Sequence, residues 1–110
     1  MPTPESKVKA KVNRILSKYP NIYKFMPVQT GYGVPSLDYL LCIRGTFVAI
    51  ETKKAGGKPT ERQERTIKEI LAAGGTTFVV CGEDDTSQLE EYLKDTHHDD
   101  HKLLCLLGRV

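Results

Sequence analysis

LDYLLCIRGTFVAIETK, residues 37–53, is the stretch of sequence that decides the fold. Two apolar runs flank its central Arg44-Gly45, and glycine supplies the positive φ that a tight turn requires. The pattern predicts a β-hairpin with strands 37–43 and 46–53 and with Arg44 and Gly45 as the two turn residues. A hairpin is marginal alone and needs further elements packed against it.

The sequence on both sides of the hairpin supplies such elements. Thr3-Pro4-Glu5 has the form of a helix start, and apolar residues then recur at helical spacing until Pro20. Four more elements are expected: a strand at 22–28, a helix from Thr60 to Gly74-Gly75, a strand at 76–81, and a helix capped by Asp84, Asp85 or Thr86. The order is α-β-β-β-α-β-α. Because a strand–helix–strand unit implies a right-handed crossover, the expected class is α/β, a mixed sheet flanked by helices.

Length and composition indicate one folded domain over residues 1–110. Hydrophobic residues make up 39% of the chain, which is enough for a core and argues against wholesale disorder. No apolar run approaches the roughly 18 residues of a membrane span, and no apolar signal core follows Met1. We therefore expect a soluble, cytoplasmic protein.

Charge is unevenly distributed along the chain. Residues 1–28 hold six basic and one acidic residue, a net charge of +5, whereas residues 83–110 hold three basic and eight acidic residues, a net charge of −5. A basic first half suits a polyanion such as nucleic acid, and a merely uneven solvated surface is the alternative. Among the cysteines, Cys42 and Cys81 lie in apolar runs and are expected to be buried free thiols.

Three charged side chains converge in the predicted hairpin. With Arg44-Gly45 as the turn, Asp38 lies directly opposite Glu51, and their Cβ atoms are about 4.5–5.5 Å apart. Lys53, two residues after Glu51, projects from the same face. Two like charges at that distance require a compensating cation, and carboxylate oxygens are the ligands that Mg²⁺ prefers. The alternative is an ordinary hairpin with charges on its solvated face.

These motifs resemble the VRR-NUC branch of the PD-(D/E)XK nuclease superfamily, which has a restriction-endonuclease-like core. The resemblance lies in Gly33-Val34-Pro35-Ser36-Leu37-Asp38, in Ala49-Ile50-Glu51-Thr52-Lys53, and in Thr60 with Gln63. It covers roughly residues 3–82 and leaves a C-terminal helix and apolar tail at 83–110. In one respect the chain departs from the family name, because Ser36-Leu37 separates Pro35 from Asp38.

The resemblance implies a role for each matching residue. Asp38 and Glu51 would bind the catalytic Mg²⁺ or Mn²⁺, joined by the backbone carbonyl of Thr52. Lys53 matches the catalytic lysine, and Gln63 matches a glutamine that lies over the site from the next helix. Glu5 matches a metal-site glutamate on the first helix.

Two of these residues also have a simpler interpretation. Glu5 continues the apolar stripe of the first helix, yet a glutamate in a first turn also interacts favourably with the helix dipole. Thr60-x-x-Gln63 already accounts for Gln63 as part of a capping box. Both roles of Gln63 are compatible.

Basic residues around the proposed site are expected to contact DNA phosphates without reading sequence, and they are Lys54, Lys58, Arg62 and Arg65. Tyr19, Tyr23 and Tyr39 are expected to be packing residues. Tyr32, in the Gly-rich loop, is either a further packing residue or stacks on an opened base of bound DNA. We interpret residues 97–101, which include three histidines, as a solvated segment rather than a metal site.

Taken together, the resemblance implies a metal-dependent DNA endonuclease. Small stand-alone members of the family are similar to phage-type homodimers that cut branched DNA such as Holliday junctions. A nicking or flap endonuclease, or a nucleic-acid-binding protein that does not cut, are the alternatives. A dimer would place two identical sites on a two-fold substrate. The apolar residues 103–107, with Cys105, are the expected interface, and a final strand at the edge of the sheet is the alternative.

Overall fold

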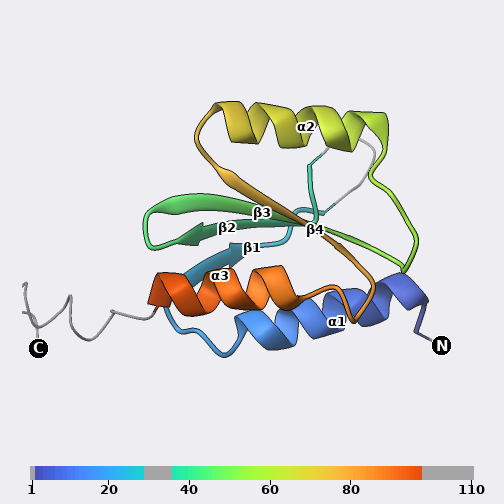
Figure 1. Ribbon diagram of the computed structural model, residues 1–110, viewed down its shortest axis with the longest axis horizontal. Coiled ribbons are helices and arrows are strands. Elements are labelled where there is room, and N and C mark those ends of the chain that lie inside the picture. The colour runs from blue at the N-terminus through green and yellow to red at the C-terminus, as the bar shows by residue number, and fades with distance from the viewer. Residues whose placement is uncertain (1, 29–35, 98–110) are drawn as a thin grey trace, which may run out of the picture.

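The computed structural model describes residues 2–28 and 36–97. Within these ranges the elements are α1 (Pro4–Leu16), β1 (Ile22–Phe25), β2 (Tyr39–Ile43), β3 (Thr46–Lys53), α2 (Glu61–Ala72), β4 (Thr76–Cys81) and α3 (Ser87–His97). The strands form one mixed sheet in the order β1-β2-β3-β4, with α2 on one face and α1 and α3 on the other (Figure 1). The predicted α/β class with a mixed sheet is confirmed.

The central hairpin has the predicted turn and register. Arg44 and Gly45 both have positive φ, 53° and 85°, as a two-residue hairpin turn of type I′ requires. Tyr39 pairs with Ile50 across the antiparallel β2 and β3. β3 spans the predicted residues, but β2 begins two residues later than predicted, because the Asp38 N–H donates to a side chain rather than to a strand. The register that brings Asp38 opposite Glu51 is nevertheless the one expected.

The core lies between the sheet and the helices α1 and α3. Thr3 caps α1 by accepting the N–H of Ser6 at 3.1 Å, and Pro4 is the first helical residue. The fully or nearly fully buried residues come from both helices and from β2, β3 and β4: Val8, Val12, Ile15, Leu16, Tyr39, Leu41, Ile43, Val48, Ile50, Val80, Leu89 and Leu93. No helix in the described part of the chain is long and apolar enough to cross a membrane.

The parallel pair of β3 and β4 continues the hairpin toward α2. β3 connects through α2 to β4, and Lys53 at the end of β3 lies beside Cys81 at the end of β4. The Gly82 N–H donates to the Lys53 carbonyl at 2.9 Å, so backbone pairing extends past Lys53. Thr60 and Gln63 form the predicted capping box at the start of α2. The backbone of Lys53 is therefore held by its pairing with the end of β4.

The described residues cover only part of the sheet face that carries α2. α2 packs mainly against β4, and none of its residues is fully buried. On the other side of this face, Tyr23 lies beside Cys42 and Cys42 beside Phe47, and all three are exposed. The expectation that Cys42 is a buried thiol is wrong, because the helix that would bury it lies over β4. Cys81 is half-buried, and its thiol donates to the Gly57 carbonyl at 3.4 Å.

Tyr39 ties the hairpin to α1. Its side chain is fully buried, and its hydroxyl donates to the carbonyl of Lys9 at 3.1 Å. Burial, with the charge of Asp38 adding to it, raises the pKa of Tyr39 to about 12, so the hydroxyl stays a donor at every physiological pH.

We predict that Tyr39→Phe lowers the free energy of unfolding by about 1 kcal/mol, because the hydrogen bond between β2 and α1 is lost while the ring still packs. Urea unfolding measures the change. The matched control is Tyr23→Phe, since Tyr23 is 71% exposed and should tolerate loss of its hydroxyl. Equal stability of the Tyr39→Phe variant and the wild type would show that this bond does not stabilise the fold.

Candidate metal centre

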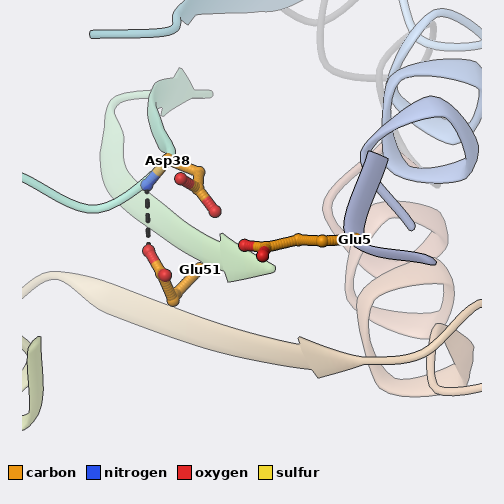
Figure 2. Close-up of side chains that lie close together, drawn as sticks. All are labelled: Glu5, Asp38 and Glu51. Carbon is orange, nitrogen blue, oxygen red and sulfur yellow. Dashed lines mark hydrogen bonds between the residues drawn. The ribbon is translucent and has the colours of Figure 1, made fainter. Parts of the chain in front are cut away.

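Three carboxylates from separate parts of the chain meet at one end of the sheet. Glu5 is in the first turn of α1, Asp38 immediately precedes β2, and Glu51 is in β3. One carboxylate oxygen of each lies within 4.8 Å of the others. Figure 2 shows Glu5 reaching from α1 toward the carboxyl groups of Asp38 and Glu51. The topology thus brings residues 5, 38 and 51 to a common point.

Backbone amides fix Asp38 and Glu51 relative to each other. The Asp38 N–H donates to Glu51 Oε1 at 3.2 Å (Figure 2). In the opposite direction, Asp38 Oδ2 accepts from the Thr52 N–H at 2.9 Å and from the Thr52 hydroxyl at 2.7 Å. Because Thr52 is fully buried, these donors cannot turn to water. The two carboxylates are therefore held in place before any ligand arrives.

Glu51 is buried and has two further partners. Its side chain accepts from Gln63 Nε2 at 2.8 Å, and Lys53 Nζ lies 3.5 Å from the same oxygen, Oε2. Burial raises the pKa of Glu51 to about 7, and the negative charge of Asp38 adds to the shift, while Lys53 opposes it. Gln63 thus combines the capping-box role with a direct contact to Glu51, as the sequence suggested.

Lys9 is a site residue that the sequence reasoning missed. Its Nζ lies 3.7 Å from Asp38 Oδ1, on the side of the cluster that α1 forms. A signal for it was present in the sequence, because Lys9 follows Glu5 by four residues and so lies on the same face of a helix. Two ammonium groups therefore border the three carboxylates, Lys53 at Glu51 and Lys9 at Asp38.

The arrangement favours a bound cation. Two ionised carboxylates 4.8 Å apart repel by about 3 kcal/mol when the effective dielectric constant is about 20. Carboxylate oxygens suit hard divalent ions such as Mg²⁺ and Mn²⁺, and the cluster has no histidine or cysteine that would favour zinc. Thr52 contacts Asp38 through its N–H and its hydroxyl, and the metal-binding role expected for its backbone carbonyl stays a prediction.

The predicted DNA-contacting residues lie on the surface. Lys54, Lys58, Arg62 and Arg65 are all exposed, the first two in the loop after β3 and the others on α2. Tyr32 is outside the described residues, as are His98 and His101. The ring of His97, at the end of α3, packs on Tyr19 with a centroid distance of 4.6 Å, and its Nδ1 is 2.8 Å from the Leu93 carbonyl. His97 thus serves the packing of α3.

Comparison of the chain with protein-family models, with curated proteins and with solved structures found no match. The resemblance to VRR-NUC nucleases accordingly depends on the motifs of the chain itself.

The raised pKa of Glu51 predicts how the metal-free protein responds to pH. The folded state holds this proton more tightly than the unfolded chain, whose carboxyl has a pKa near 4.5. The stabilisation from Glu51 is therefore complete below about pH 4.5 and is lost as the pH rises through about 7. Asp38, Glu5 and Lys53 are the charged groups that face it.

We predict that in EDTA the melting temperature of the wild type falls between pH 5 and pH 8 relative to that of Glu51→Gln, which cannot ionise at this position. Thermal unfolding followed by circular dichroism measures the difference at each pH. Glu91→Gln, at an exposed position of α3, is the control and should follow the wild type. Parallel pH profiles of the wild type and Glu51→Gln would contradict a raised pKa.

Proposed function

We propose that the protein is a Mg²⁺- or Mn²⁺-dependent DNA endonuclease with a restriction-endonuclease-like core. The observation that carries the proposal is the convergence of Glu5, Asp38 and Glu51 with the ammonium group of Lys53 beside them. Carboxylates that can share a divalent ion, next to a lysine, are a frequent arrangement for phosphodiester hydrolysis. The exposed Lys54, Lys58, Arg62 and Arg65 add positive charge that suits a polyanionic substrate.

Each residue has a defined part in the proposed reaction. When bound, the divalent ion would polarise the scissile phosphodiester and acidify a water molecule. Glu5, Asp38 and Glu51 would hold the ion, with Asp38 oriented by Thr52 and Glu51 oriented by Gln63. Lys53, half-buried and anchored at the end of β3, would hold the attacking water or a phosphate oxygen. The substrate class, branched DNA such as a Holliday junction, follows from the family resemblance.

Two other functions remain as outcomes of the test. A nicking or flap endonuclease would use the same residues on a different DNA geometry. A nucleic-acid-binding protein that does not cut would need none of the carboxylates and no cation. A panel of linear, nicked, flap and four-way DNA, each incubated with and without Mg²⁺, separates these cases.

We predict that Lys53→Ala lowers the rate of DNA cleavage by roughly 10²–10³-fold, because the group that acts on the reacting atoms is lost. DNA affinity should stay nearly unchanged, since one phosphate contact among many adds little. Lys58→Ala, in the exposed loop after β3, is the matched variant and should weaken binding roughly three-fold while sparing the chemical step. Single-turnover cleavage and fluorescence anisotropy measure the two effects. Cleavage by Lys53→Ala at the wild-type rate would contradict the assigned role.

We also propose that the active form is a homodimer. The interface expected at residues 103–107, with Cys105, lies outside the described residues. The described part offers a second apolar surface, the sheet face with Tyr23, Phe25 and Phe47, which are 71%, 52% and 46% exposed. These rings alone expose roughly 300 Å², a substantial share of the roughly 800 Å² that each partner buries in a stable interface. No charged side chain lies on the strand positions between them, so two copies can meet without repulsion.

We predict a mass of twice 12.3 kDa by light scattering at micromolar concentration. Phe25→Glu should shift the protein toward the monomer, because it places a charge in the apolar face. Gln88→Glu, which adds the same charge at an exposed position of α3, should leave the dimer intact. A wild type that is monomeric both free and on a four-way junction would contradict the proposal and favour flap or nicking activity.

A further inference from the structure

Lys9 stands beside the carboxylate cluster without a place in the proposed reaction. It follows Glu5 by one helical turn, and its Nζ is 3.7 Å from Asp38 Oδ1. Its side chain is 39% exposed, twice the 18% of Lys53 on the other side of the cluster. The two lysines therefore differ in kind: Lys53 is enclosed at the end of a central strand, and Lys9 reaches the cluster from the solvent side.

The backbone of Lys9 is fixed, and its ammonium group lies at the end of a long, partly exposed side chain. The Tyr39 hydroxyl donates to the Lys9 carbonyl at 3.1 Å, and the neighbouring Val8 is in the core. The side chain of Lys9 is a flexible four-carbon stem, and its ammonium group forms the ion pair with Asp38. With its backbone fixed and its side chain flexible, Lys9 can move its ammonium group by a few ångströms from one partner to another.

Lys9 contacts Oδ1 of Asp38, the carboxylate oxygen that does not accept the hydrogen bonds from Thr52. Oδ2 already accepts two hydrogen bonds from Thr52, at 2.9 and 2.7 Å, whereas Oδ1, among residues 2–28 and 36–97, has only the longer contact with Lys9. A cation shared by Glu5, Asp38 and Glu51 would compete for Oδ1, because a divalent ion and an ammonium group repel each other at one oxygen. Occupation of the cluster would therefore release Lys9.

Charge balance indicates where the released group goes. With all three carboxylates ionised, the cluster and its two lysines carry a formal charge of −1. A divalent ion changes this to +1, which complements the single negative charge of a phosphodiester. An ammonium group at the solvent side of the cluster is then free to donate to that phosphate.

Resting on the function proposed above, we propose that Lys9 is an exchangeable counter-ion. In the metal-free protein it neutralises Asp38, and when a divalent cation enters the cluster it transfers to a phosphate oxygen of the DNA. Lys9 thereby couples metal binding to DNA binding. The bound cation releases Lys9 to contact DNA, and bound DNA draws Lys9 away from the carboxylate that the cation needs.

The test measures Mn²⁺ binding and DNA binding separately from cleavage. For Lys9→Met, isothermal titration without DNA should show Mn²⁺ binding about two- to five-fold tighter, because the competing ion pair is gone. Anisotropy with four-way DNA in Ca²⁺ should show affinity roughly three-fold weaker, and in EDTA it should show no change. Lys9→Arg should restore the affinity in Ca²⁺. Lys7→Met, at an exposed position of α1, is the matched control and should leave Mn²⁺ affinity unchanged.

Each departure from this pattern has a distinct meaning. Unchanged Mn²⁺ affinity in Lys9→Met, or a loss of DNA affinity that is equal in EDTA and Ca²⁺, would overturn the exchange and leave Lys9 as a passive contact. Failure of the wild type to bind Mn²⁺, or binding that survives Asp38→Asn undiminished, would instead overturn the metal centre itself. A wild type that binds Mn²⁺ and cuts DNA while Lys9→Met behaves identically would reject only the role of Lys9.

Discussion

The structure depends on holding negative charges together against their repulsion. Asp38 and Glu51 are locked by reciprocal bonds, the Asp38 N–H to the Glu51 carboxylate and the Thr52 N–H and hydroxyl to the Asp38 carboxylate. Glu51 is 2% exposed, so water contributes little to its solvation. The Asp38 N–H, the Gln63 amide and the Lys53 ammonium group replace that water. The carboxylates stay this close together only if the surrounding helices and strands are rigid enough to resist their repulsion.

The fold supplies this rigidity with few elements. The hairpin sets the positions of residues 38 and 51, β4 and the Gly82 N–H extend the sheet past Lys53, and the Tyr39 hydroxyl joins the hairpin to α1. α1 then brings Glu5 and Lys9 to the cluster, and α2 brings Gln63 (Figure 1). Within the described ranges, the same arrangement leaves part of one sheet face uncovered, because α2 lies over β4 and no helix covers the aromatic side of the edge strand β1.

Local sequence patterns were sufficient to predict much of the fold and the pairing of Asp38 with Glu51. Arg44-Gly45 predicted the turn, the turn predicted the register, and the register brought Asp38 opposite Glu51. The capping box of Thr60 and Gln63 and the bounds of β3 and β4 followed from equally local signals. The roles of these residues in catalysis are a separate matter: the motifs suggest them, and they stay predictions.

Features that depend on how the helices and strands pack together could not be predicted from the sequence. Cys42 lies in an apolar run, yet its exposure is decided by which strand α2 covers, and no local pattern encodes that. Lys9 is one of several lysines on α1, and only the packing of α1 against the hairpin distinguishes it. β2 begins later than predicted because the Asp38 N–H donates to the Glu51 side chain instead of to a neighbouring strand. Strand propensities do not account for such a side-chain acceptor.

The proposed metal centre requires that Glu5, Asp38 and Glu51 hold one divalent cation. The most direct test is anomalous diffraction at the manganese edge from a crystal equilibrated with Mn²⁺. We predict an anomalous peak at coordination distance from a carboxylate oxygen of each of the three residues, and its loss in Asp38→Asn. A saturated crystal with no peak at this position, or with its manganese bound elsewhere, would contradict the proposed metal centre.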